Sequence, residues 1–325
     1  GDAIAIVAAD TSAIAHAAAD LIEVTYEPLP VVDNPVDALK PGAPLVHEVP
    51  PAGSHVHGNE LKHIFVNKGD VDAGLRESDV VVSGEYQTAT TEHAFLEPEC
   101  SIARITPDGR YEVIVGSQIP YSDRKQVADA LGIPEKQVRI KGALIGGGFG
   151  GKEDITGQIH AALLARATGR PVKILYRRDE SLLVHPKRHA VRFVLSIGAM
   201  KDGRINALKV ELWGDGGAYA SLSDKVMTRA ATHASGPYDI PHVKIDCHAV
   251  YTNNVPCGAF RGFGVTQSAF AVESVLDEIA RQLGMDPIAL REKNALRVGS
   301  TTNTGALIRE GAGLLKCINR VREAF

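Results

Sequence analysis

The pattern of hydrophobic and polar positions predicts a chain of mixed strands and helices. Alternating apolar and polar residues predict strands over 3–8, 22–26, 80–90, 138–145, 172–177, 190–197 and 205–213, and a hairpin over 103–115 that turns at Asp108-Gly109. Apolar residues at helical spacing predict helices over 11–21, 123–131, 155–167 and 267–283. Because strands and helices do not alternate strictly, the order favours an α+β fold over a doubly wound sheet.

A proline-rich segment interrupts this pattern early in the chain. Seven prolines stand between residues 28 and 60, together with several glycines. Proline removes a backbone donor and breaks helices and central strands, so we expect no regular element there. The segment predicts a boundary between a small βαβ-like piece and the rest of the chain.

Composition and charge exclude several classes of partner. The chain has 325 residues, 44% of them hydrophobic, which is enough for one large or two ordinary cores. Its net charge is only -4 and both signs are interspersed, so no broad basic face for nucleic acid or an anionic membrane is expected. No apolar run approaches 18 residues and no basic-then-apolar leader opens the chain, which argues against a membrane span or a signal peptide. The missing initial Met suggests a fragment.

The four cysteines indicate a reduced, cytoplasmic chain. Cys100, Cys247, Cys257 and Cys317 are scattered, with no C-x-x-C pair and no zinc spacing with histidine. Iron–sulfur ligation needs clustered cysteines, so any such cluster is expected on another polypeptide.

The stretch "LIGGGFGGKED" at 144–154 fits two phosphate-binding patterns incompletely. Gly146, Gly148 and Gly151 satisfy G-x-G-x-x-G, but the nearest strand-end acids come nearly thirty residues later, where the dinucleotide motif needs one after about twenty. Gly146, Gly151 and Lys152 begin a P-loop, yet Glu153 stands in place of the magnesium-binding hydroxyl. A third interpretation is a sharp strand-to-helix turn. The loop alone leaves all three open.

Three other motifs carry polar or aromatic groups. "GAFRGFG" at 258–264 places Arg261 between two phenylalanines on a glycine-flanked segment, and "SQIP" ends a predicted strand with Gln118. "HPKRH" at 185–189 has two histidines next to cations that would repel a metal ion, so we interpret it as structural or phosphate-facing.

The motifs "SQIP", "GGGFGGKE", "VMTRA" and "GAFRGFG", in this order, resemble the molybdenum-binding subunit of the xanthine dehydrogenase and aldehyde oxidase family. The resemblance covers nearly the whole chain, and the spacings of 35 residues from Gln118 to Glu153 and of 32 from Arg229 to Arg261 agree with it. It implies the end of a hammerhead-type α/β domain over 1–35, a linker over 36–60, and the first half of the molybdenum cofactor-binding domain over 61–325.

The resemblance also assigns roles to residues. Gln118 matches an amide that hydrogen-bonds the apical oxygen of the molybdenum centre, and Gly148, Phe149 and Gly150 match a loop lying against molybdenum and pterin. Arg261 matches an arginine supporting the metal pocket. Gln118, Phe149 and Arg261 would thus lie near the metal without binding it directly.

Three residues concern the substrate. Phe263 matches an aromatic that contacts the substrate ring, and Glu153 with Arg229 matches the pair that separates xanthine dehydrogenases from aldehyde oxidases. A carboxylate and a guanidinium can hydrogen-bond both edges of an oxidised purine and stabilise charge on its ring. The resemblance therefore implies hydroxylation of xanthine or a related purine at a ring carbon.

Further parts of the enzyme are expected outside this chain. The family's general-base glutamate belongs to the second half of the molybdenum subunit, so no catalytic residue is assigned here and the chain alone should be inactive. A molybdopterin cofactor, in a dinucleotide form, is expected with molybdenum, and [2Fe-2S] clusters and FAD are expected on partner subunits. Rival interpretations are a hydroxylase of nicotinate, another N-heterocycle or an aldehyde, and a non-catalytic scaffold.

Overall fold

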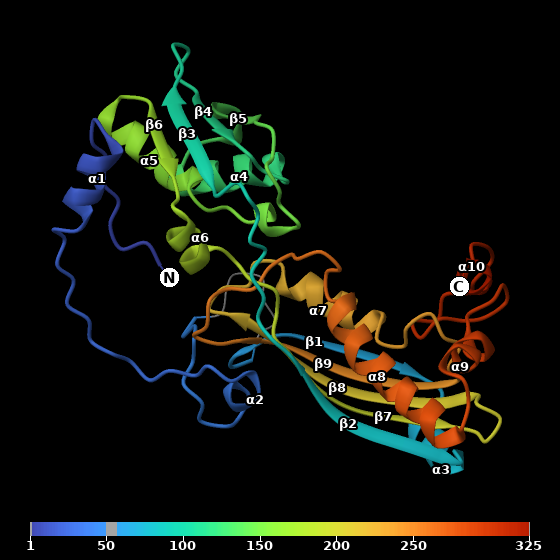
Figure 1. Ribbon diagram of the computed structural model, residues 1–325. Coiled ribbons are helices and arrows are strands. Elements are labelled where there is room, and N and C mark those ends of the chain that lie inside the picture. The colour runs from blue at the N-terminus through green and yellow to red at the C-terminus, as the bar shows by residue number, and fades with distance from the viewer. Residues whose placement is uncertain (1, 50–56, 325) are drawn as a thin grey trace. The chain divides into compact units, whose positions relative to one another are not determined.

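The computed structural model describes residues 2–49 and 57–324, and these residues divide into two compact units (Figure 1). Among the described residues, unit 1 comprises 2–31, 91–188 and 255–261, and unit 2 comprises 32–49, 57–90, 189–254 and 262–324. The chain therefore passes between the units several times, and each unit is assembled from segments that are far apart in the sequence.

Unit 2 is built on a five-stranded mixed sheet in the order β1-β9-β8-β7-β2. Its strands are β1 (Glu60–Lys68), β2 (Val80–Thr88), β7 (Val191–Ala199), β8 (Ile205–Gly217) and β9 (His242–Tyr251). Neighbouring strands are antiparallel except β8 and β9, which are parallel. Alternate residues of β7, β8 and β9 are buried, as the period-two pattern of a sheet with one covered face requires.

Helices cover the buried face of this sheet. In Figure 1, α7 (Ser223–Thr232) and α8 (Val265–Leu283) lie on one side of the sheet. Their small and aliphatic residues pack against the strands in one large core, represented by Met227, Val275 and Leu276, all at most 1% exposed. The remaining helices of the unit are α2 (Pro35–Ala38), α3 (Val71–Glu77), α9 (Pro287–Asn294) and α10 (Leu314–Ala324).

Unit 1 carries a four-stranded mixed sheet in the order β5-β4-β3-β6. Its strands are β3 (Cys100–Ile105), β4 (Tyr111–Val115), β5 (Val138–Gly142) and β6 (Val172–Leu175). The helices α4 (Pro120–Leu131) and α5 (Gln158–Thr168) share a separate core with these strands. The unit also contains α1 (Ser12–Ala19) and α6 (Arg178–Val184). The mixed sheets with packed helices confirm the α+β prediction.

The elements predicted near the N-terminus are partly wrong. Helix α1 forms, with the Thr11 hydroxyl accepting a hydrogen bond from the Ile14 N–H, but 3–8 and 22–26 form no strand. An alternating pattern makes a strand only where another strand supplies hydrogen bonds, and within the described ranges no segment pairs with these two.

Part of the proline-rich segment, over 32–38, is more ordered than predicted, while 50–56 of the predicted linker lie outside the described residues. Helix α2 begins with Pro35 in its first turn, where the missing N–H costs nothing, and the Asn34 side chain caps it. Val32 and Ala38 are buried with Val250 of β9. Across residues 2–49 and 57–324, no helix is long and apolar enough to cross a membrane.

Candidate functional site

The glycine-rich loop of unit 1 follows β5 and is tied to Gln118. The Gln118 Oε1 accepts hydrogen bonds from the N–H groups of Gly150 at 3.1 Å and Lys152 at 3.3 Å. The Gln118 N–H in turn donates to the Lys152 carbonyl at 2.9 Å. Because Oε1 is engaged by the loop, the remaining polar atom of the side chain is its Nε2, which donates to Oε1 of Glu153 at 3.4 Å.

The loop needs glycine at specific positions. A Cβ on Gly148 would lie 2.3 Å from the Gln118 Oε1, and one on Gly150 would lie 2.8 Å from the backbone of Ala259. Gly150 also has a φ of +99°, and Phe149 beside it has a φ of +55°, in the left-handed region. Gly148 and Gly150 are therefore required because a Cβ at either position would overlap neighbouring atoms, and Gly150 also has a left-handed backbone conformation.

The loop presents backbone donors that the protein itself does not use. In the part of the chain that the structure describes, the N–H groups of Gly147, Gly148 and Phe149 have no hydrogen-bond acceptor. Backbone N–H groups brought together in a turn with left-handed residues form a concavity that binds anions and oxygen ligands. The loop therefore fits an oxygen-rich or anionic cofactor.

Arg261 adds a cation at the same loop. Its N–H donates to the Phe149 carbonyl at 2.9 Å, and its own carbonyl accepts from the Arg188 guanidinium at 2.9 Å. The Arg261 side chain is exposed, and over the described ranges its guanidinium makes no ion pair or hydrogen bond. These two bonds fix the backbone of Arg261 against the loop, and its exposed guanidinium carries a charge that no acidic group in the described ranges neutralises.

Lys152 anchors the loop instead of facing a phosphate. Its side chain is only 4% exposed, lies over the Phe95 ring and forms a 2.7 Å ion pair with Glu97. Glu97 also accepts a 2.5 Å hydrogen bond from the Gly146 N–H. Burial by itself would raise the pKa of Glu97, but these two donors outweigh it and lower that pKa. The P-loop hypothesis fails because its lysine is already engaged.

Two buried histidines also hydrogen-bond the backbone of the loop and of the segment beside it. The His185 Nε2 donates to the Gly151 carbonyl at 3.0 Å, and the His93 Nε2 donates to the Ala259 carbonyl at 2.7 Å. Burial lowers the pKa of His93 to about 4, so the ring is neutral at neutral pH. His185 thus contacts the loop backbone, and the interpretation of "HPKRH" as structural or phosphate-facing stays a prediction. The role of His93 was not predicted, because no local pattern signals a contact across 166 residues.

The remaining predicted residues belong to unit 2. Arg229 lies on α7, and its guanidinium is 5.5 Å from the centre of the Phe263 ring. The segment before α8 approaches α7 closely, since a Cβ on Gly264 would lie 2.3 Å from the Val226 carbonyl oxygen. Arg229 is exposed, and within residues 2–49 and 57–324 its side chain has no acidic partner. This cation is therefore available to a ligand.

Unit 1 brings together most of the site predicted from the sequence. The residues connected by the contacts above are Gln118, Gly148, Phe149, Gly150, Glu153 and Arg261. Unit 2 pairs Arg229 with Phe263. The roles assigned to these residues toward metal, cofactor and substrate stay predictions.

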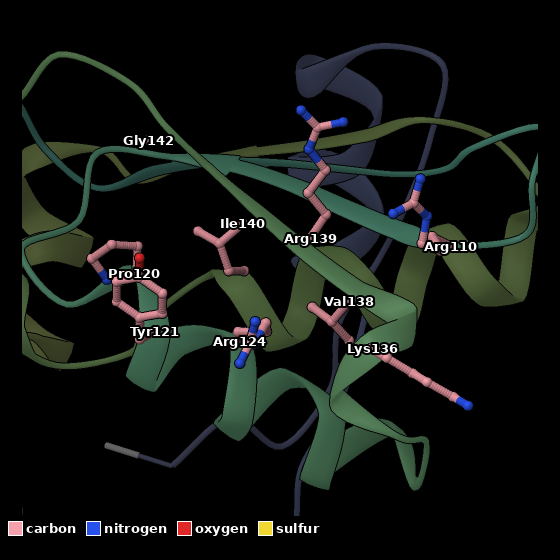
Figure 2. A pocket seen from close by; sticks show the side chains of 9 residues that line it. All are labelled: Arg110, Pro120, Tyr121, Arg124, Lys136, Val138, Arg139, Ile140 and Gly142. Atoms are coloured by element: carbon pink, nitrogen blue, oxygen red, sulfur yellow. The ribbon is translucent and has the colours of Figure 1, made fainter.

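Unit 1 also contains a pocket that is lined by several basic side chains. It has a volume of about 490 Å³ and is lined by residues of α4, β5 and the adjoining turns (Figure 2): Arg110, Pro120, Tyr121, Arg124, Lys136, Val138, Arg139, Ile140 and Gly142. Arg110 pairs with Asp108 and Arg124 with Glu135, so much of its positive charge is neutralised. None of the predicted site residues lines it.

Comparison with known proteins identifies the family. A model of the molybdopterin cofactor-binding domain matches residues 55–295. The chain is also 42% identical over 323 residues to the nicotinate dehydrogenase large molybdopterin subunit of Eubacterium barkeri, covering 99% of this chain and 74% of that protein. The chain belongs to the molybdenum hydroxylase family.

Other molybdenum hydroxylases are similar over this whole chain or nearly so. The xanthine dehydrogenase molybdenum-binding subunit of Escherichia coli is 33% identical over 326 residues, which cover 100% of this chain and 42% of that protein. The solved aldehyde oxidoreductase of Desulfovibrio gigas superposes with a TM-score of 0.91 at 31% identity, over 98% of this chain and 34% of that one. The chain thus spans less than half the length of these two relatives.

Proposed function

We propose that the chain is part of a molybdenum hydroxylase that oxidises xanthine or a related purine at a ring carbon. The observation that carries the proposal is the 3.4 Å approach of the Gln118 Nε2 to the Glu153 carboxylate, beside a loop with unused backbone donors. One group predicted to bind the cofactor and one predicted to bind the substrate are thereby neighbours.

The loop and Arg261 would hold the cofactor. The free N–H groups of Gly147, Gly148 and Phe149 would donate to its oxygen or sulfur atoms, and the Arg261 guanidinium would balance its negative charge. When bound, the molybdenum centre supplies the two-electron oxidation. The second half of the molybdenum subunit, the general-base glutamate in it, [2Fe-2S] clusters and FAD would come from outside this chain.

Glu153 and Arg229 would orient the substrate. A carboxylate accepts from ring N–H groups, and a guanidinium donates to a ring carbonyl oxygen and stabilises negative charge that develops there. Phe263 would contact the flat ring. Each of these contacts would limit the orientations of the bound ring, and prior positioning of a substrate lowers the barrier to its reaction.

Kinetics of the complete enzyme complex would test the substrate assignment. We expect Glu153→Gln and Arg229→Met each to lower kcat/KM for xanthine by roughly a hundredfold, equivalent to about 3 kcal/mol of lost stabilisation, with unchanged molybdenum content. Lys225→Met, an exposed charge on the same helix as Arg229, is the matched control. Unchanged xanthine kinetics in both site variants would remove them from substrate binding, and aldehyde turnover without purine turnover would overturn the proposal.

Nicotinate hydroxylation is the second candidate. It is favoured by the 42% identity to the nicotinate dehydrogenase subunit over nearly the whole chain. Nicotinate carries an anionic carboxylate, which Arg229 could bind but Glu153 would repel. If nicotinate is the substrate, Glu153→Gln should preserve or raise its kcat/KM whereas Arg229→Met lowers it. A purine substrate predicts losses in both variants.

A further inference from the structure

Three side chains with metal-ligand atoms meet on the sheet of unit 2. His63 lies on β1, and Asp246 and His248 lie on the antiparallel neighbour β9. In β9 the intervening Cys247 is buried in the core, so Asp246 and His248 point to the opposite face. His63 stands directly opposite His248 in the strand register, which places all three side chains on that face.

The ligand atoms converge on one carboxylate oxygen. Oδ1 of Asp246 lies 2.5 Å from Nε2 of His63 and 3.3 Å from Nε2 of His248, and the ligand atoms all lie within 4.8 Å of one another. Ligands at about 2.0–2.1 Å from a tetrahedral ion are separated by roughly 3.3 Å. Small side-chain rotations would therefore bring all three onto one ion.

Glu60 sets the proton position on His248. Its Oε1 lies 2.5 Å from Nδ1 of His248, and because a carboxylate can only accept, the ring donates from Nδ1. The other ring nitrogen, Nε2, lies 3.3 Å from Oδ1 of Asp246 and is therefore the atom of His248 placed beside the other ligand atoms. A carboxylate behind a histidine in this way is the common support of a metal-binding imidazole.

We propose that His63, Asp246 and His248 bind a divalent transition metal ion of the Zn²⁺ type, with Glu60 as the positioning residue. Two imidazoles and one carboxylate suit such an ion, and a water molecule would complete a tetrahedral set. The side chains are 46%, 29% and 22% exposed, so an ion can enter from solvent. The site lies wholly in unit 2 and does not depend on the function proposed above.

Trp213 supplies a reporter next to the site. It is the chain's single tryptophan, and its ring stacks 6.3 Å from that of His248 at an angle of 12°. We expect the untagged, metal-free chain to bind about one Zn²⁺ by calorimetry at pH 7.5. Ni²⁺, a paramagnetic ion that accepts the same ligands, should quench Trp213 fluorescence, and Zn²⁺ should reverse the quenching by competition.

Variants separate this site from adventitious binding. The double variant His63→Gln with His248→Gln should lose quenching and weaken Zn²⁺ binding by about a hundredfold or more, and Glu60→Gln should weaken it by roughly tenfold. His16→Gln, on α1 of unit 1, is the control and should change neither.

Far-UV circular dichroism without metal would establish that the variants are folded. If the double variant does not fold, the isosteric Asp246→Asn replaces it and should weaken binding by tenfold or more. Absence of quenching in the wild-type chain, or equal quenching in a folded variant lacking the ligands, would overturn the proposal.

Discussion

Unit 1 and unit 2 support their chemistry in different ways. In unit 1 the candidate groups are largely backbone atoms of a glycine loop, held by buried polar side chains such as Lys152 and His185. In unit 2 they are side chains that project from a helix and a sheet over one large apolar core. A loop of this kind is sensitive to any added atom, whereas a side chain on a packed sheet can be exchanged without disturbing the fold.

A substitution in the loop should produce the largest effect. Gly150→Ala adds a Cβ 2.8 Å from the Ala259 backbone at a φ of +99°, so strain and overlap together should cost unit 1 about 3 kcal/mol or more. Gly109→Ala is the control for strain alone, since it has a φ of +79° and open space around its Cβ, and should cost about 1–2 kcal/mol. Urea unfolding followed by hydrogen exchange of β3 to β6 measures the difference.

The same experiment tests whether the units are independent. Trp213 lies on β8 and reports on unit 2 alone. If the units unfold separately, Gly150→Ala will shift the exchange of unit 1 and leave the Trp213 transition in place. Equal shifts in both signals would show that the two units form one cooperative structure.

Acid should weaken unit 1 through His93. Its folded pKa of about 4 lies below the ordinary value of 6.5. Between these two pH values the imidazole is protonated in the unfolded chain but stays neutral in the folded one. The stabilisation is complete above pH 6.5 and is lost as pH falls toward 4, by roughly 3 kcal/mol at most. His93→Gln keeps an N–H donor but cannot be protonated, so its stability should change less over this interval. Parallel pH profiles for wild type and variant would contradict this explanation of the contact.

The ion pair between Lys152 and Glu97 should contribute less to the stability of unit 1 than the neutral His93 does. Lys152→Met removes the partner of Glu97, whose partial exposure reduces the penalty, so we expect a loss of about 2 kcal/mol. The matched control is Lys125→Met, which breaks an exposed pair with Asp129 and should cost no more than about 0.5 kcal/mol. Equal losses in chemical denaturation would mean that the loop does not depend on its anchor.

Hydrophobic periodicity and turn residues correctly predicted the elements that form from one continuous segment of the chain. The hairpin β3–β4 and helices α4 and α8 lie where periodicity and the Asp108-Gly109 turn placed them. Strand β9 was missed although its residues alternate, and the strands expected over 3–8 and 22–26 do not form because nothing pairs with them in the described chain. Whether a segment finds a partner strand depends on the whole fold and cannot be predicted from the sequence of that segment alone.

In the candidate site, too, some residues could be predicted from local motifs and others could not. Gln118, the glycine loop and Arg261 were predicted to lie together, and the contacts of unit 1 connect them. The anchors Glu97 and His93 were not predicted, since a single buried acid or histidine resembles any other until its partner is known. Such residues become recognisable only when distant segments are placed side by side.

Metal and pterin analysis of the purified natural complex would show whether the glycine loop of unit 1 holds a molybdenum cofactor. We expect about one molybdenum and one pterin per chain in the wild type and in Gly109→Ala, and a severe loss of both in Gly150→Ala, whose added Cβ disturbs the loop. A wild-type complex that contains neither molybdenum nor pterin, or a Gly150→Ala complex that retains both in full, would mean that this loop does not hold the cofactor.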